Sequence, residues 1–349
     1  MTVDEMDLVR QLKDAAPLRP GAYEQAQAML RDTMAESGGR NRRRRAGAWG
    51  KAGIGAGIAA AAAAAAAIAL VAAPAPRPAG AAGRAGAVAQ APPVTSKLVS
   101  LAALIKASGG TLPGDASLVI RTQTIDGKSP DVSYNLYTDS GAFYGGGDKK
   151  SLMQAVARHE DDAGGIDARE VAAARSAAAG DLAAARVRMV NASPNYLGLG
   201  LGPGARNKLW AQAKAKSAAI YKEKGITFPA NPPTGKALRE DADNYLWNNS
   251  VDALSAGGGD PQVREGALRL LSTISAVRMA NSTAGRQPAL TLTAGPEVFG
   301  GASSEVLTIN ARTGMPIKAE VPAEGNVPSS VQTFQVSRVT LAGIKAGQF

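Results

Sequence analysis

The chain's one histidine lies in the stretch whose residue types are best suited to acid–base chemistry or cation binding. His159 is followed directly by Glu160, Asp161 and Asp162, and the 349 residues contain no other histidine and no cysteine. Acid–base catalysis and metal binding both need such groups to converge with a nucleophile or a second ligand. Because no such partner is evident, we interpret the stretch as a solvated helix end and predict neither a catalytic residue nor a metal ligand.

Four glycines alternate with other residues at positions 198, 200, 202 and 204, a pattern similar to a phosphate-binding loop. A P-loop follows a strand and ends in Gly-Lys-Ser or Gly-Lys-Thr, and this run has neither feature. We therefore interpret it as a flexible loop before a helix that starts near Pro203. With no convergent catalytic group, the sequence predicts a protein that is not an enzyme and that holds no cofactor.

Aromatic residues form only 4% of the chain, and several gather in its middle. Two interpretations stay open for them. They pack in the core, or they line a ligand groove between helices and a sheet. The groove hypothesis assigns contacts with an apolar ligand to Trp210, Tyr221, Tyr245 and Trp247.

An uncharged segment rich in alanine and glycine, residues 52–73, divides the chain. A helix of that length spans roughly 33 Å, which matches the hydrocarbon core of a bilayer. The segment follows a basic cluster with a tryptophan, which we assign to the membrane border: Arg42, Arg43, Arg44, Arg45, Trp49 and Lys51. Because basic flanks tend to stay in the cytoplasm, we predict a single-pass protein of the cell membrane, with its N-terminus cytoplasmic and its C-terminal domain extracytoplasmic.

Two other interpretations of residues 52–73 stay open. An arginine pair before a mildly apolar run also suits a cleaved export signal, although the preceding part of the chain is longer than in usual signals. A soluble alanine-rich helix is the third interpretation, and so long an uncharged run suits a soluble surface poorly. Gly53 and Gly57 have the G-x-x-x-G spacing that lets two membrane helices pack closely, which would make the chain a homodimer.

Residues 1–36 predict a short cytosolic helical hairpin, broken at Pro17 and Pro20. The segment is too small to bury a stable core alone, so it is either a loosely structured tail or a docking segment for a cytosolic partner. Its contact stripe would consist of Leu8, Leu12, Tyr23 and Leu30. Residues 37–51 form a basic juxtamembrane segment, and its position beside the apolar run favours lipid head groups over nucleic acid.

The remaining chain changes its hydrophobic period twice. Residues 74–95 are rich in alanine, proline and glycine and predict a linker. Within residues 96–349, alternating runs predict three strands up to Tyr144, helices follow with a break at Gly180 and Asp181, and five short strands end the chain. Strands at both ends predict one α+β domain, an antiparallel sheet with a helical middle, whose two strand groups come together. Two separate small domains are the alternative.

Several stretches carry a resemblance to a known group of proteins. They are MDLVRQLKDAAPLRPGAYEQAQAMLRDTM, the Arg-rich border with the Ala-rich anchor, NLYTDSGAFYGG, VREGALRLLSTISAVRM and EVLTINARTGMPI. The chain resembles actinobacterial single-pass membrane proteins, many of them encoded beside sigma factors of the extracytoplasmic-function type. It departs from zinc-containing anti-sigma factors, because it has no cysteine, and no histidine before the anchor. INARTGMPI is also similar to a strand-turn-strand of lipoprotein-carrier half barrels, which would give a curved sheet around an apolar ligand.

The resemblance implies a role in envelope signalling, and two functions stay open. The first is an anchored envelope sensor or regulator, which binds a ligand or envelope protein outside and a sigma factor or other regulator inside. The second is a membrane-tethered carrier for lipid or peptide, in which the cytosolic tail only aids insertion. Deleting residues 2–36 separates the two, since only the first function needs them.

Overall fold

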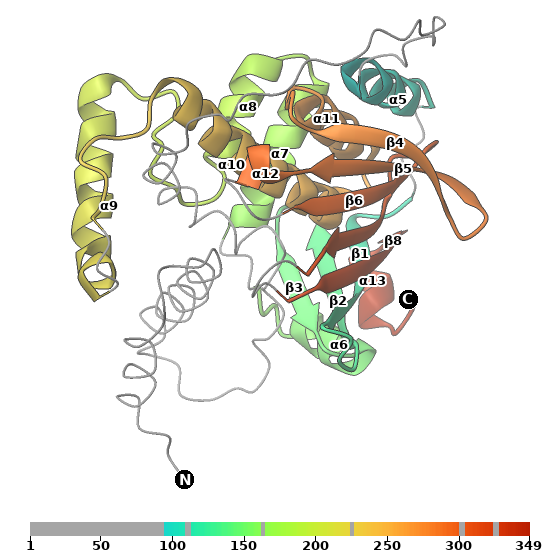
Figure 1. Cartoon of the computed structure of the whole chain (residues 1–349). Coiled ribbons are helices and arrows are strands. Elements are labelled where there is room, and N and C mark those ends of the chain that lie inside the picture. The colour runs from blue at the N-terminus through green and yellow to red at the C-terminus, as the bar shows by residue number, and fades with distance from the viewer. Residues whose placement is uncertain (1–93, 109–112, 162–164, 224–226, 300–303, 324–327) are drawn as a thin grey trace, which may run out of the picture.

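The computed structural model describes residues 94–108, 113–161, 165–223, 227–299, 304–323 and 328–349 (Figure 1). The predicted cytosolic hairpin, basic border and membrane helix lie outside these residues, and so do residues 74–93 of the linker and Leu8, Leu12, Tyr23, Leu30, Gly53 and Gly57. The last two residues of the predicted linker belong to a helix that begins at Val94. Within the described part, no helix has the length and hydropathy needed to cross a bilayer.

Eight strands form one open, fully antiparallel sheet with the order β3-β2-β1-β8-β7-β6-β5-β4 (Figure 1). The strands are β1 (Ala116–Ile125), β2 (Asp131–Thr138), β3 (Phe143–Gly146), β4 (Arg278–Ala284), β5 (Gln287–Ala294), β6 (Glu305–Asn310), β7 (Pro316–Val321) and β8 (Ser330–Val339). The first strand of the N-terminal group pairs with the last strand of the C-terminal group, with Val119 opposite Val336. The predicted α+β sheet of two joined strand groups is therefore confirmed, and the two groups do not form the separate small domains of the alternative.

The described helices are α5 (Val94–Ser108), α6 (Lys149–Ala157), α7 (Ile166–Ala178), α8 (Leu182–Val190), α9 (Pro203–Glu223), α10 (Gly235–Gly257), α11 (Pro261–Leu271), α12 (Pro296–Phe299) and α13 (Leu341–Lys345). The predicted break at Gly180 and Asp181 is confirmed, because Asp181 caps α8 by accepting a hydrogen bond from the Ala184 backbone N–H at 3.2 Å. The same cap type starts α11, where Asp260 precedes a proline at the first helical position.

Alternation along the strands divides the core between the two faces of the sheet. Val119 and Phe334 face the main core, which the sheet forms with α5, α7, α8, α10 and α11. Leu118 and Leu136 face the opposite side, where they pack against Leu152 of α6 and residues of α13. Successive strand residues point to opposite faces, so β1 and β2 are covered on both sides.

The helical layer has little room for larger side chains where α7 and α11 meet. A Cβ atom at Gly266 of α11 would lie 1.7 Å from the carbonyl oxygen of Ala174 on α7. Both helices carry small residues at this contact, with Ala173, Ala174 and Ala267 fully or almost fully buried. Glycine at position 266 therefore sets the distance between the two helices.

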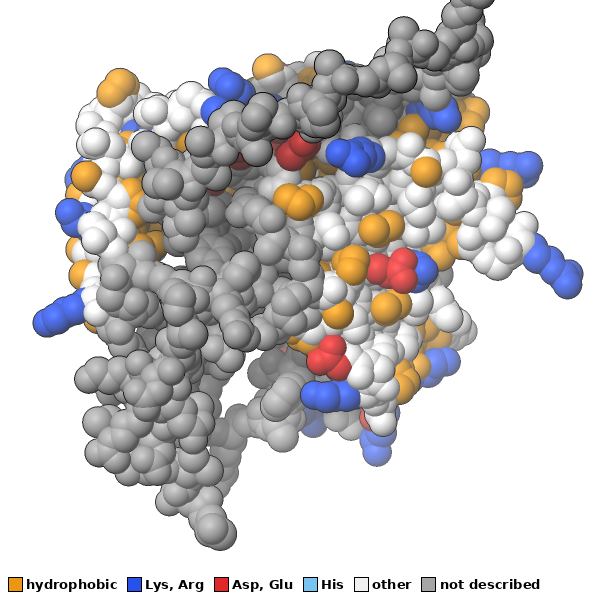
Figure 2. All heavy atoms as spheres, viewed as in Figure 1, with side chains coloured by type: hydrophobic (Ala, Val, Ile, Leu, Met, Phe, Trp, Pro, Cys, Tyr) orange, Lys and Arg blue, Asp and Glu red, His pale blue; other side chains and the backbone are white. Residues whose placement is uncertain are grey.

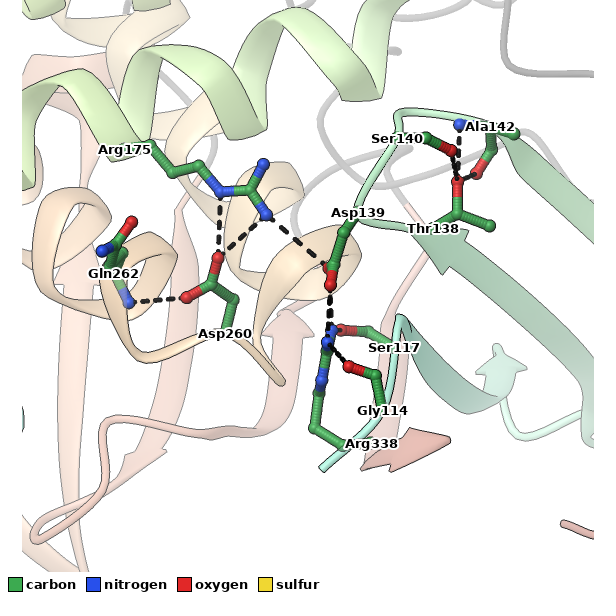
Figure 3. A network of polar contacts seen from close by, with 10 residues as sticks. All are labelled: Gly114, Ser117, Thr138, Asp139, Ser140, Ala142, Arg175, Asp260, Gln262 and Arg338. Atoms are coloured by element: carbon green, nitrogen blue, oxygen red, sulfur yellow. Dashed lines mark hydrogen bonds and ion pairs between the residues drawn. The ribbon is translucent and has the colours of Figure 1, made fainter. Parts of the chain in front are cut away.

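A network of ion pairs joins the sheet to these helices (Figure 3). Arg338 of β8 binds both carboxylate oxygens of Asp139, just after β2, at 2.9 and 2.7 Å, and donates to the Gly114 carbonyl at 2.6 Å. Arg175 of α7 lies 3.7 Å from Asp139 and 2.9 Å from Asp260, the cap of α11. The hydrogen bonds from Arg338 lower the pKa of Asp139. One network thus connects both strand groups to α7 and α11.

Candidate functional site: a buried acidic cluster

The four aromatic residues of the predicted groove lie in two separate clusters. Trp210 and Tyr221 of α9 pack around Phe228, with ring centroids 5.0 and 4.9 Å from its ring. Tyr245 and Trp247 lie on α10 in the main core, and Trp247 has no exposed surface. The structure therefore does not bring the four side chains together, and Tyr245 and Trp247 serve as core residues.

The other two stretches that could carry chemistry, around His159 and around the alternating glycines, lie next to the ends of helices. His159 is exposed and adopts a left-handed backbone conformation, with φ of 54°, just after α6. Asp161 accepts a hydrogen bond from the Phe143 backbone N–H at 3.0 Å, which ties this helix end to β3. Gly198 and Gly200, both with positive φ, form a loop between α8 and α9. Among the described residues, no group of three or more His, Cys, Asp or Glu side chains is arranged to hold a metal ion.

A set of polar side chains lies where apolar ones are expected, on the inner face of β1 and β2. Arg121, which is 7% exposed, stands opposite Ser133 in the register and donates from Nε to its Oγ at 3.3 Å. Asn135 donates to the same Oγ at 3.2 Å. A buried guanidinium needs anionic partners near it, and the helices opposite supply them.

Four carboxylates gather around this inner face, and we call them the acidic cluster: Asp167 and Glu170 of α7, Asp252 of α10 and Glu305 of β6. Glu170 is 0% and Glu305 1% exposed, whereas Asp167 and Asp252 are partly buried. Glu305 is held by Trp247, whose Nε1 donates to Oε2 at 2.9 Å. Glu170 and Glu305 therefore lie in the core, and Asp167 and Asp252 lie at its edge.

Burial raises the pKa of every member of the cluster for which a shift is resolved. For Asp252, burial and then the carboxylates of Asp167 and Glu305 raise the pKa to about 8, against the opposing charge of Arg121. Burial raises the pKa of Glu305 to about 7, although the Trp247 hydrogen bond opposes it. Burial and the charges of Asp252 and Asp167 raise the pKa of Glu170 well above its usual value. Asp252 and Glu305 thus take up protons near neutral pH.

Two oxygens of the cluster accept no hydrogen bond from the residues that the structure describes, namely Glu170 Oε2 and Glu305 Oε1. An ionised carboxylate in that position would leave a buried charge without full compensation. A neutral carboxylic acid loses far less hydration free energy on burial. The hydrogen-bond pattern and the raised pKa values therefore agree that the protonated form suits this packing.

The cluster comes close to the surface at Ser193, beyond the end of α8. Ser193 Oγ lies 2.7 Å from Asn249 Oδ1 and 3.3 Å from Glu170 Oε1, so its one proton can serve either acceptor. Ser193 also lines a surface hollow of about 300 Å³, together with Asn191, Pro194, Asn195, Gly198, Leu201 and Leu209. One hydrogen bond therefore separates the hollow from a buried carboxylate.

The four carboxylates were not among the residues that the sequence singled out. What could have identified them is a charged residue at a position that the helix or strand period assigns to the apolar face. Glu170 shares a helix face with Ala173, Ala174 and Ala177, and Glu305 precedes Leu307 in the alternation of its strand. A charged residue at an inward position indicates burial of that charge, but it does not show which other charges meet it.

No family model matches the chain, and neither a curated protein nor a solved structure matches it significantly.

Proposed function

We propose that the chain is a membrane-anchored envelope regulator whose folded domain responds to conditions outside the cytoplasm. In this proposal residues 52–73 are the anchor, residues 96–349 lie outside, and residues 1–36 contact a sigma factor or another cytosolic regulator. The observation that carries the proposal is the acidic cluster, because two fully buried and two partly buried carboxylates lie close enough to affect one another's pKa values.

Protonation of the cluster supplies the response. With protons bound, the space between sheet and helices is close to neutral and the packing of α7 and α10 on β1 and β2 is favoured. Loss of those protons places several like charges there, opposed by Arg121 and, beside Glu170, by Arg169. Like charges in a buried site repel strongly. A rise in external pH therefore loosens α7 and α10, and a fall in external pH tightens them.

Limited proteolysis at two external pH values tests this response in membranes that hold the full chain with its outer domain accessible. Cleavage of the outer domain should be faster near pH 8 than near pH 6, since stability falls as the raised pKa values are passed. A chain carrying Asp252→Asn and Glu305→Gln should lose most of that difference. Equal pH dependence in the two chains would contradict the proposal.

The cytosolic end of the proposal has its own test. A pull-down from membranes should recover a cytosolic partner with the native chain and lose it with Leu8→Asp and Leu30→Asp. Leu18→Asp is the matched control, because it adds the same charge between the two prolines and outside the predicted stripe. Recovery of the same proteins with all variants would remove residues 1–36 from the function.

The alternative, a tethered carrier with a half-barrel sheet, draws on the open antiparallel sheet and on the hollow beside Ser193. The inner face of the sheet, however, is occupied by α10 and α11, where Leu254 and Leu268 are fully buried. A peptide in the surface hollow therefore fits this alternative better than a lipid inside the sheet. Co-purification of a lipid or peptide with the protein, and full function without residues 2–36, would favour it.

A further inference from the structure

Helix α9 stands apart from the helical layer, on the side of the molecule opposite the β4–β5 hairpin (Figure 1). Its side chains donate hydrogen bonds to neighbouring loops. Arg206 donates from Nε to the Leu197 carbonyl at 2.7 Å, and Trp210 donates to the Pro229 carbonyl at 3.1 Å. Trp210 and Ala213 are buried in the small aromatic cluster around Phe228. One stripe of the helix is therefore fixed, and the rest faces solvent.

The solvent-facing side of α9 is basic. Lys208, Lys214, Lys216 and Lys222 are all exposed, and none of them forms an ion pair with a described residue. Basic side chains of other helices do have such partners, as Arg186 of α8 does in Asp243. Figure 2 shows basic side chains along this side of the molecule. The four lysines therefore make the exposed part of α9 positive, and we call it the lysine face.

Small residues lie between these lysines. Ala211, Ala215, Ala218 and Ala219 are exposed on the same helix. Methyl groups allow a helix to lie close to a flat surface, while the long lysine stems reach past the backbone to anionic groups. Among the side chains of α9 that the structure describes, the exposed ones include none of the large apolar residues that anchor a protein partner at an interface. The face suits a flat anionic surface better than a groove on another protein.

We infer that the lysine face of α9 docks on the anionic head groups of the membrane that anchors the chain. This inference rests on the proposed anchor, which keeps the domain near a bilayer. A spacer of residues 74–95 reaches at most about 75 Å. Each lysine near an anionic bilayer favours the bound state about fivefold. Lys208, Lys216 and Lys222 lie within about 120° of one another around the helix. These three together favour docking on the order of a hundredfold, and screening by salt weakens the effect.

The absence of cysteine from the sequence makes the test direct. Ala215→Cys carries a fluorophore on the exposed side of α9, and Thr283→Cys carries it on the exposed side of β4. The labelled full chain is reconstituted in nanodiscs of phosphatidylcholine, with or without phosphatidylglycerol, that contain a head-group quencher. Quenching at position 215 should require phosphatidylglycerol, fall at high salt and exceed quenching at position 283.

Two charge variants identify the lysines as the cause. Lysine-to-glutamine changes at 208, 214, 216 and 222 remove four charges from α9 and should abolish the quenching at position 215. The control changes Lys128, Lys150, Arg286 and Lys345 to glutamine, which removes the same net charge from exposed positions elsewhere, and should keep it. Near-native circular dichroism and thermal unfolding show that both variants are folded.

The inference is overturned if quenching at position 215 does not depend on phosphatidylglycerol, or if it persists in the α9 variant. Equal loss in both charge variants overturns it too, because net charge alone would then explain docking. If the chain does not insert into nanodiscs, that result contradicts the proposed membrane anchor and not the lysine face. The same labelled chain is then mixed with phosphatidylglycerol vesicles. Quenching at position 215 that is lost in the α9 variant supports docking through the lysine face. Absence of quenching at position 215 contradicts it.

Discussion

Replacing Glu305 by glutamine should stabilise the protein at alkaline pH and leave its stability nearly unchanged at acidic pH. Glutamine keeps the shape of the side chain, and its amide oxygen can accept the hydrogen bond that Trp247 donates to Glu305 at 2.9 Å. What it removes is the titration of a carboxyl group that is 1% exposed. Any pH-dependent difference between the two proteins therefore reports the burial of that charge.

The sign follows from the direction of the shift. The pKa of Glu305 rises from 4.5 to about 7 on folding, mainly because burial disfavours the charged form. The native protein is therefore most stable below the unfolded pKa, loses stability as pH rises towards 7, and changes little beyond it. A shift of that size corresponds to about 3 kcal/mol. In a domain of this size it corresponds to a midpoint difference of about 6–12 °C.

The assay is unfolding of the full chain by heat and by urea near pH 5 and near pH 8, followed by tryptophan fluorescence. Glu320→Gln is the matched control, because it removes the same charge from a partly exposed carboxylate on β7. Glu305→Gln should approach the native protein near pH 5 and exceed it near pH 8. A variant that is equally or less stable than the native protein at both pH values would refute the reasoning, because the ionised carboxylate would then be well accommodated.

Three further substitutions test the packing and the ion-pair network by thermal unfolding at one pH. Gly266→Ala should destabilise the protein by about 3 kcal/mol or more, since its Cβ would meet the Ala174 carbonyl oxygen at 1.7 Å; Gly204→Ala, in the first turn of α9 with open space and no positive φ, is the steric control. Leu268→Ala should cost about 2–5 kcal/mol, because the side chain is fully buried in the main core; an effect below 1 kcal/mol would contradict that placement. Arg338→Lys should cost about 2 kcal/mol, since lysine cannot bind Asp139 through two nitrogens and also reach the Gly114 carbonyl; no change would show that the network is dispensable.

Local pattern was enough to place most of the helices and strands. The period of two around Leu118 and Leu136 and the Gly180–Asp181 break both depend on neighbours in sequence, and the structure has both. The pairing of Val119 with Val336 depends on residues more than two hundred positions apart. Alternation shows that a strand has an inner face, but it does not show which strand lies beside it. The joined sheet was therefore one of two alternatives until its register was known.

The acidic cluster could not be predicted from the sequence. Glu170 and Asp252 lie on different helices and Glu305 on a strand, so no spacing in the sequence connects them. In the sequence, each of these carboxylates is only a single charged residue on an otherwise apolar face. Their common effect on pKa arises only when α7, α10 and β6 are packed together. For the same reason the sequence could not show where the aromatics of the groove hypothesis lie relative to one another, and Trp210 and Trp247 belong to different clusters.

The β1–β8 pairing also constrains how the chain can fold while it is being made. β1 is synthesised more than two hundred residues before β8, which is one of its two neighbours in the sheet. Until β8 arrives, one edge of β1 presents unpaired backbone groups, and such an edge invites pairing with other chains. Contacts of such large sequence separation also slow folding. A chain that stops before Ser330 is left with two open strand edges inside its sheet, so truncation from the C-terminal end should produce aggregation rather than a smaller stable domain.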